Sequence, residues 1–368
     1  MRTAKIFLSI YVAVFGLTSS AFVNFEHEML SDFVKETKQI EVPGFPDAFN
    51  PSIVRWHGAL LMSFRTGHYE LASDCEEDSF LMSFRFRSGA DLSTNNIGLV
   101  FLNPQFKPVG PVQVLNISYK DSSIEARQQD PRLISIDGKI YMAYSNIIAG
   151  KEQPEIRRMF VAELIHNGRE FEVSPPVCLA SFEGQNEQRW QKNWVPFEHL
   201  KTLKMAYSIE PHLILEPNIT TGDCQTVAKT KIEKLEWDWG VLRGGTPAMR
   251  IGSEYLAFFH SSKEMKTAHS DGKKIQHYFA GAYTFDKDPP FRVIRVSKQP
   301  IVGRNFYEGL EHKTWKPVRV VFPGGFVADE KHIWMFYGRQ DHEIWVAKLD
   351  KHELYQSMQS VSKPLDDF

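Results

Sequence analysis

Five distant segments of the sequence carry polar residues of the kinds that bind sugars or phosphate and that move protons. These residues are Asn50, Asp130, the pair Lys192-Asn193, Arg243 and Asp341. Carboxylates, cations and amides that converge from separate segments are what a polar ligand site requires. Asn-Pro and Asp-Pro pairs are also ordinary turn residues. Their recurrence at equivalent positions of a repeat nevertheless favours a shared site.

The segments that carry these residues share one pattern. Each has an apolar or proline-containing entry, a short turn and then a strand, and the segments start at residues 50, 130, 194, 246 and 322. Repeated hairpins with little helical signal predict an all-β fold, a five-bladed β-propeller. A pair of β-sandwiches is the competing fold. In a propeller the inner strands meet at one axis, so their first residues would gather there.

Composition excludes several classes of protein. The 368 residues include 43 Lys and Arg against 45 Asp and Glu, with 42% hydrophobic and 13% aromatic residues. This balance is not that of a disordered chain. A near-neutral chain also lacks the basic surface that nucleic-acid binding needs, so we expect no nucleic-acid partner.

The sequence gives no sign of a metal or organic cofactor. The histidines show no ligand spacing, and no C-x-x-C pair, Walker loop, nucleophile-elbow serine or dinucleotide fingerprint occurs. We therefore expect neither a metal nor a bound cofactor. Cys75, Cys178 and Cys224 are too few for a disulfide framework, which leaves open one bridge with a free thiol or three buried thiols.

The first 21 residues have the features of a secretory signal peptide. Arg2 and Lys5 precede the apolar run 6–17, and small residues follow up to Ala21, after which we expect cleavage. This predicts a secreted, secretory-pathway or periplasmic protein, with an uncleaved anchor as the alternative. No later segment is apolar for long enough to span a membrane. The sequons at Asn116 and Asn218 are weak signals because such triplets arise by chance.

We divide the rest of the chain into three parts. Residues 22–44 form an N-terminal extension, 45–350 the propeller and catalytic domain, and 351–368 a C-terminal tail. Short helices are expected over 26–36 and 350–360.

The repeat motifs resemble glycoside hydrolase family 130 (GH130), the inverting β-mannoside phosphorylases and β-1,2-mannosidases built on five-bladed propellers. The resemblance spans about residues 45–348, and its motifs stand in the family's order. They include Asn50-Pro51-Ser52-Ile53, Phe64-Arg65, Asp130-Pro131-Arg132, Lys192-Asn193-Trp194, Gly244-Gly245-Thr246-Pro247, Phe259-His260, Tyr278, Phe322-Pro323-Gly324-Gly325 and Tyr337-Gly338 with Asp341. The chain is therefore expected to be a divergent relative of this family.

The resemblance implies a glycosidase-type enzyme that acts on a mannose-containing oligosaccharide or glycan. Asp130 matches the general acid of the family, which passes its proton through a sugar hydroxyl. Inorganic phosphate serves the phosphorylases as nucleophile, so it is a possible co-substrate. The residues that match substrate or phosphate contacts are Asn50, Arg65, Arg132, Lys192, Asn193, His260, Tyr278 and Asp341.

Several positions depart from the family pattern. Gln129 replaces the usual Glu, Val241 replaces a phosphate-binding Lys, and Tyr207-Ser208 replaces a His-Arg pair. Arg243 can substitute for one missing cation, because a guanidinium also grips phosphate. Glu210 is a candidate base for activating water. These departures favour hydrolysis slightly over phosphorolysis. Mannosyl transfer, a catalytically inactive glycan-binding propeller and a scaffold without a ligand stay open.

Overall fold

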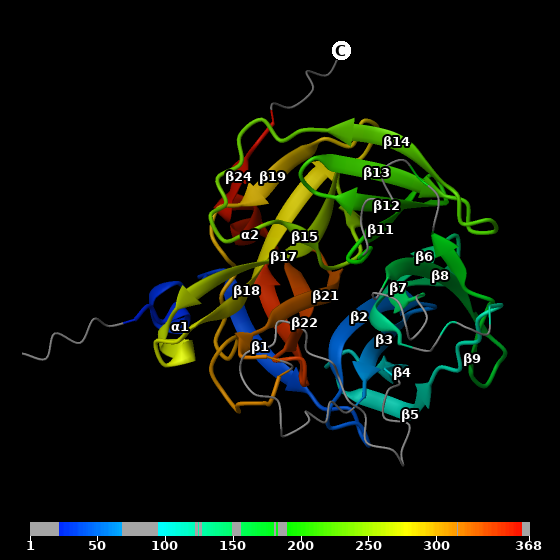
Figure 1. The fold of residues 1–368 in the computed structure, drawn as a ribbon, viewed down its shortest axis with the longest axis horizontal. Helices are drawn as coiled ribbons and strands as arrows, with labels where there is room; N and C mark the ends of the chain where they lie inside the picture. Colours follow the sequence, from blue (N-terminus) through cyan, green and yellow to red (C-terminus); the bar gives the residue numbers. More distant parts are fainter. Residues whose placement is uncertain are drawn as a thin grey trace, which may run out of the picture.

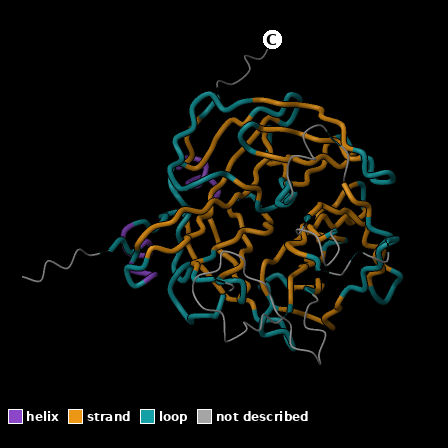
Figure 2. Tube along the Cα trace, in the orientation of Figure 1, coloured by secondary structure: helices purple, strands orange, loops and turns teal. Residues whose placement is uncertain are grey.

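The computed structural model describes residues 22–67, 95–121, 124, 127–148, 156–179, 182, 190–314 and 316–362. The predicted signal peptide and Cys75 lie outside these residues. In the described part nearly all regular structure is β-strand, as Figure 2 shows. The prediction of an all-β chain is confirmed.

Within the described ranges the strands form five sheets around a common centre (Figure 1). Four of these sheets have the four-strand path of a propeller blade. One contains β2 (Phe49–Trp56), β3 (Ala59–Thr66), β4 (Asn96–Leu102) and β5 (Pro108–Val114). The next contains β6 (Gln129–Ile136), β7 (Lys139–Ile147), β8 (Arg157–His166) and β10 (Val177–Leu179), with β9 (Phe171–Val173) beside β8. A third contains β11 (Val195–His199), β12 (Thr202–Ser208), β13 (His212–Pro217) and β14 (Cys224–Thr230). The fourth contains β21 (Val321–Ala328), β22 (His332–Arg339), β23 (Glu343–Asp350) and β1 (Val34–Ile40).

The remaining sheet is larger and irregular. It contains β15 (Arg243–Gly244), β16 (Met249–Ile251), β17 (Glu254–Lys266), β18 (Lys274–Asp286), β19 (Val293–Ser297), β20 (Val318–Arg319) and β24 (Met358–Ser360). The arrangement is therefore propeller-like with four blades, and the expectation of a five-bladed propeller is wrong. The physical reason is the length of β17 and β18, whose 13 residues each leave room for extra partners. β20 joins β18 in parallel, and β24 joins β19.

Both ends of the described chain are built into the sheets. The predicted N-terminal helix is only a short turn, α1 (Phe25–Glu28), capped by the Asn24 side chain. The chain then forms β1, which pairs with β23. At the other end α2 (Lys351–Ser357) begins after Asp350, whose side chain accepts a hydrogen bond from the Glu353 N–H. α2 lies within the predicted C-terminal helix and leads directly into β24.

The sheets bury both of their faces. Seven of the eight residues of β3 are buried, rather than every second residue, because neighbouring sheets pack against each side. The largest core cluster includes Phe258 and Phe259 of β17 and Phe279, Tyr283 and Phe285 of β18. This packing fixes the inner strands, and β2 contacts both β6 and β21 at the centre.

Candidate active site

Asn50 and Asp130 occupy the same position in two different sheets. Each lies in an irregularity of the ladder near the start of an inner strand, between Phe49 and Ser52 in β2 and between Gln129 and Arg132 in β6. Both residues have left-handed backbones, with φ of 47° and 54°. Asn and Asp tolerate this conformation better than other non-glycine residues. A bulge re-aims the side chain that it carries, and here it turns both side chains toward each other.

The Asp130 carboxylate is held by a buried amide and a buried guanidinium. Asn50 Nδ2 and Arg65 Nη1 both donate to Asp130 Oδ1, each at 2.9 Å. The side chains of Arg65 and Asp130 are only 6% and 9% exposed. Arg65 also stacks over the Phe49 ring, with Cζ 4.6 Å from the ring centroid.

Arg132 ties three segments together instead of presenting its charge to a ligand. Its Nη1 donates to the Asp130 carbonyl at 3.0 Å, its Nε to the Gly245 carbonyl at 2.6 Å, and its Nη2 to Asn193 Oδ1 at 3.2 Å. The backbone at Gly244 lies directly against Asn193. A Cβ at Gly244 would be 2.2 Å from the Asn193 carbonyl oxygen, so glycine permits this contact. Arg132 and Asn193 therefore position the site.

Cations surround Asp130 and control its ionisation. Burial alone would raise the pKa of Asp130, but Arg65, Lys192 and Arg132 together outweigh burial and hold that pKa well below its usual range. The Asn50 hydrogen bond acts in the same direction. Asp130 is therefore a carboxylate in the ligand-free protein, whereas a general acid must carry a proton.

The cations are themselves crowded. Burial first, and then repulsion from Arg157, Arg243 and Arg65, lowers the pKa of Lys192 although Asp130 opposes the change. The pKa of His260 lies well below its ordinary value, because the ring is buried and also senses Arg132, Arg243 and Lys192. His260 is thus neutral, and it stacks on Tyr278 with 5.8 Å between the ring centroids. Its buried Nδ1 has no hydrogen-bond partner in the described part of the protein.

A second carboxyl group faces this set of charges from the turn between β22 and β23. Asp341 has a left-handed backbone with φ of 52°. Burial and the charge of Asp130 raise the pKa of Asp341, against the opposing effect of Arg65, His342 and Lys192. Tyr278 senses both carboxylates, and its pKa is raised by burial and by Asp341.

Eight of the predicted site residues therefore interact across the centre of the sheets, and we call them the axial cluster. They are Asn50, Arg65, Asp130, Lys192, Arg243, His260, Tyr278 and Asp341. Arg132 and Asn193 hydrogen-bond to each other, and Arg132 also holds the Asp130 carbonyl.

Glu210 is not brought to the axial cluster. It lies in the exposed turn between β12 and β13, and its Oε2 accepts a hydrogen bond of 2.7 Å from the Ile232 N–H. In the described ranges no interaction joins it to Asp130. The carboxylate of Glu210, the expected base, binds this backbone amide instead.

Sequence analysis did not single out two further residues that lie at the site. Arg157, on β8, is buried and contributes to the pKa of Lys192. Trp190 lies with its ring 5.4 Å from Lys192 Nζ and 5.9 Å from Arg157 Cζ. Trp190 could have been found from its place two residues before Lys192. Arg157 stands on the third strand of its sheet and carries no motif.

The described residues contain no group of three or more His, Cys, Asp or Glu side chains placed to hold a metal ion. They also contain no helix that is long and apolar enough to cross a membrane. Cys178 and Cys224 are both free thiols.

Solved structures share this fold. A β-1,2-mannobiose phosphorylase from Listeria innocua matches with a TM-score of 0.57 and 16% identity, over 88% of this chain and 93% of its own. A structure from the GH130 family of mannoside phosphorylases, which contains glycoside hydrolases that target β-1,2-mannosidic linkages in Candida mannan, matches with a TM-score of 0.56 and 15% identity, over 95% and 98%. A GDP-Man-dependent mannosyltransferase from Leishmania mexicana matches with a TM-score of 0.51 and 11% identity, over 89% and 92%.

The likeness is one of fold. No protein-family model matches the chain, and neither does any curated protein. The structural neighbours nevertheless include the family that the sequence motifs resemble, so a divergent GH130-like fold is confirmed.

Proposed function

We propose that this chain is a glycosidase-type enzyme that cleaves β-mannosides at the axial cluster, with Asp130 as the proton donor and inorganic phosphate as the nucleophile. The observation that carries the proposal is the group of cations around Asp130, where Arg65, Lys192 and Arg132 all act on its ionisation. The sequence favours hydrolysis slightly, because Val241 and Tyr207-Ser208 replace expected phosphate ligands. We propose phosphorolysis instead, because Lys192 and Arg243 remain as cations that can bind phosphate.

Several cations gather near the centre. Burial, together with repulsion from Arg157, Arg243 and Arg65, lowers the pKa of Lys192. A bound anion would relieve this repulsion, because it stabilises the charged form of each cation. Lys192 and the more exposed Arg243 are the side chains best placed to receive one.

Anion binding also supports a role for Asp130 as an acid. The cations keep Asp130 ionised when no ligand is bound. A phosphate dianion beside Lys192 and Arg243 would offset those charges and raise the pKa of Asp130 toward its normal range. Asp130 could then hold the proton that the departing sugar oxygen needs. The nucleophile and the acid would thus be prepared in one event.

The reaction balances without a second carboxylate. A phosphate oxygen attacks the anomeric carbon as the glycosidic C–O bond breaks, and the product is mannose 1-phosphate with inverted configuration. The proton of Asp130 reaches the departing oxygen, directly or through a sugar hydroxyl, and phosphate returns a proton to Asp130. Tyr278 and Asp341 are available to orient the sugar hydroxyls.

The signal-like residues 1–21 direct the chain into the secretory pathway or periplasm, where it meets a mannose-containing glycan. The chain needs no cofactor besides phosphate.

The decisive experiment measures which product appears. The full chain is incubated with β-1,2-mannobiose in buffers with and without inorganic phosphate, and mannose and mannose 1-phosphate are quantified. We expect mannose 1-phosphate only with phosphate present. Free mannose as the sole product at equal rates in both buffers would instead identify a hydrolase.

A second candidate is mannosyl transfer from a nucleotide sugar. The same cations suit a diphosphate as well as phosphate, and one structural neighbour is a GDP-Man-dependent mannosyltransferase. A parallel incubation with GDP-mannose and an acceptor sugar tests it. Binding of mannosides without turnover in any of these mixtures would favour a glycan-binding propeller.

A further inference from the structure

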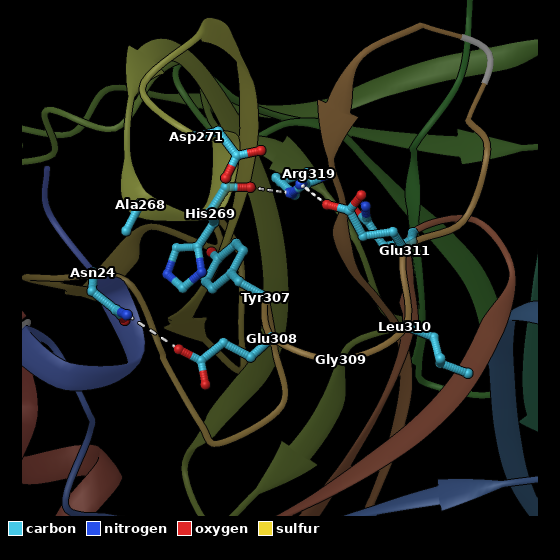
Figure 3. A pocket seen from close by; sticks show the side chains of 11 residues that line it. Asn24, Ala268, His269, Asp271, Tyr307, Glu308, Gly309, Leu310, Glu311 and Arg319 are labelled. Atoms are coloured by element: carbon cyan, nitrogen blue, oxygen red, sulfur yellow. Dashed lines mark hydrogen bonds and ion pairs between the residues drawn. The ribbon is translucent and has the colours of Figure 1, made fainter.

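Figure 3 shows a cavity of about 250 Å³ whose lining includes no residue of the axial cluster. The tip of the β17–β18 hairpin forms one wall, and the loop 307–311 forms another. Side chains that line it are Asn24, His269, Tyr307, Glu308, Glu311 and Arg319.

The cavity shares two walls with elements of the axial cluster. Tyr307 lines the cavity, and its hydroxyl donates to the Tyr278 carbonyl at 2.9 Å. Gln340 also lines the cavity and immediately precedes Asp341. Its Oε1 accepts a hydrogen bond of 2.6 Å from the Val320 N–H, which fixes the turn that carries Asp341.

Two buried acids hold the loop that forms the cavity. Glu26 accepts hydrogen bonds from the backbone N–H groups of Asn305, Tyr307 and Glu308 at 2.7, 2.7 and 2.8 Å. Glu343 binds Arg339 through two hydrogen bonds of 2.5 and 2.9 Å, and Arg339 donates in turn to the Glu308 carbonyl. The cavity is therefore preformed, as binding sites for small ligands usually are.

The charges of the lining exclude an anion as the natural occupant. Asp271, Glu308 and Glu311 contribute three carboxylates. Arg319 is the cation among the lining residues, and it already donates to Glu311 at 2.6 Å and to the His269 carbonyl. The site thus differs in sign from the axial cluster, and it would repel phosphate.

A metal ion is also a poor fit. In the residues that the structure describes, no three His, Cys, Asp or Glu side chains are placed to ligate one. The carboxylates are spread around the wall, and Glu308 is bound by Asn24 Nδ2 at 3.1 Å (Figure 3).

The mixture of groups suits a neutral polyhydroxyl ligand. Carboxylate oxygens accept hydrogen bonds from sugar hydroxyls, amide and guanidinium groups donate to them, and aromatic rings contact the apolar C–H face of a sugar. Tyr307 and His269 supply rings, with centroids 5.3 Å apart. The volume lies just below the roughly 300 Å³ at which pockets for drug-sized ligands begin. It therefore suits a single sugar residue.

We propose that this cavity is an outer subsite that binds one hexose unit of a longer β-mannoside while the bond to be cleaved lies in the axial cluster. This inference rests on the proposed function for the identity of the sugar. It makes the protein selective for oligosaccharides over disaccharides.

The test compares substrates of two lengths in matched variants of the full chain. Ala268→Trp fills the cavity from an exposed lining position, and Glu311→Ala removes a carboxylate whose side chain is 75% exposed. Glu330→Ala, in the exposed turn between β21 and β22, is the control. The readout is the ratio of KM for a β-1,2-mannobiose to KM for the corresponding pentasaccharide.

We expect this ratio to be about ten in the wild type and the control, which corresponds to about 1.4 kcal/mol of added binding. Ala268→Trp should reduce the ratio to near one, and Glu311→Ala should reduce it in part. Equal KM values for both lengths in the wild type, or a ratio that survives Ala268→Trp, would overturn the subsite.

If no variant turns over a mannoside, the proposed reaction fails but the subsite is still tested. Calorimetric titration with the pentasaccharide then provides the readout. Binding that persists in Asp130→Asn and is lost in Ala268→Trp supports the subsite. Binding that is absent in the wild type, or unchanged in Ala268→Trp, contradicts it.

Discussion

Arg65 and Asp130 form an almost completely buried ion pair between two neighbouring sheets, with 2.9 Å between Nη1 and Oδ1. A buried pair of this kind is weak evidence for stability, because the cost of desolvation offsets much of the attraction. Under the proposed mechanism, the pair keeps Asp130 ionised until a bound anion changes the balance of charge.

Replacing Asp130 by Asn tests this carboxyl group directly. We expect kcat to fall by about 10²- to 10⁴-fold, the usual contribution of a positioned acid or base. The control is Asp137→Asn in the turn of the same β6–β7 hairpin, where the side chain is 61% exposed. Initial rates with β-1,2-mannobiose and phosphate provide the measurement. Equal rates for Asp130→Asn and wild type would remove Asp130 from the mechanism.

Replacing Lys192 by Met should weaken phosphate binding more than sugar binding. A hydrogen bond to a charged group contributes about 1.5–3 kcal/mol, so we expect KM for phosphate to rise about 10- to 100-fold. KM for the mannoside should change much less. Lys234→Met, at an exposed position, is the control. Equal increases in both KM values would argue against a phosphate site at Lys192.

His212 predicts an acid-sensitive fold. This ring is fully buried beside Phe285 and Tyr283, and its Nδ1 lies 2.6 Å from the Phe291 carbonyl oxygen. Burial lowers the pKa of His212 from 6.5 to about 4. The unfolded chain therefore binds the proton more readily than the fold does. Stability from this group is complete above pH 6.5 and is lost as the pH falls toward 4.

The loss from His212 amounts to about 3 kcal/mol over that window. Urea unfolding at pH 7 and at pH 4 measures it in the wild type and in His212→Gln. The difference in unfolding free energy between the two pH values should be smaller in the variant. An identical difference in both proteins would show that another group controls acid sensitivity.

Arg339→Met should destabilise the protein by about 3–5 kcal/mol, because it leaves Glu343 buried without its main counter-charge. Glu343 also accepts a hydrogen bond from Trp345 Nε1 and lies 2.7 Å from His312 Nε2. Its carboxylate is therefore held in place by several partners. Thermal unfolding gives the comparison. Lys139→Met breaks the exposed pair with Glu163 and should leave Tm nearly unchanged. Similar Tm values for both variants would contradict the assigned importance of the buried pair.

The central residues were predictable because one local signal served two purposes. Asn50-Pro51 and Asp130-Pro131 indicate an irregular backbone near the start of a strand. Asn50 and Asp130 have left-handed backbones there, and this conformation turns their side chains inward. Glu210 shows the opposite case. Its carboxylate binds the backbone amide of Ile232, which is 22 residues away in the sequence. The residues next to Glu210 give no signal of that contact.

The seven-stranded sheet was missed for a similar reason. β20 and β24 are short, and each finds its partner through contacts distant in sequence, so no local periodicity marks them. β1 was likewise assigned to an extension, since its alternation of apolar and polar residues is weak. Arg157 carries no motif at all and became visible only beside Lys192.

The pairing of β1 with β23 has a consequence for how the protein is made. β1 emerges from the ribosome more than 300 residues before the strand to which it binds. During synthesis it must wait without a partner, and the ring closes only when the last blade is complete. Without β1 the edge of β23 would stay open, and an open edge invites pairing with other chains. Truncation before residue 41 should therefore yield an aggregating protein even though it removes no residue of the axial cluster.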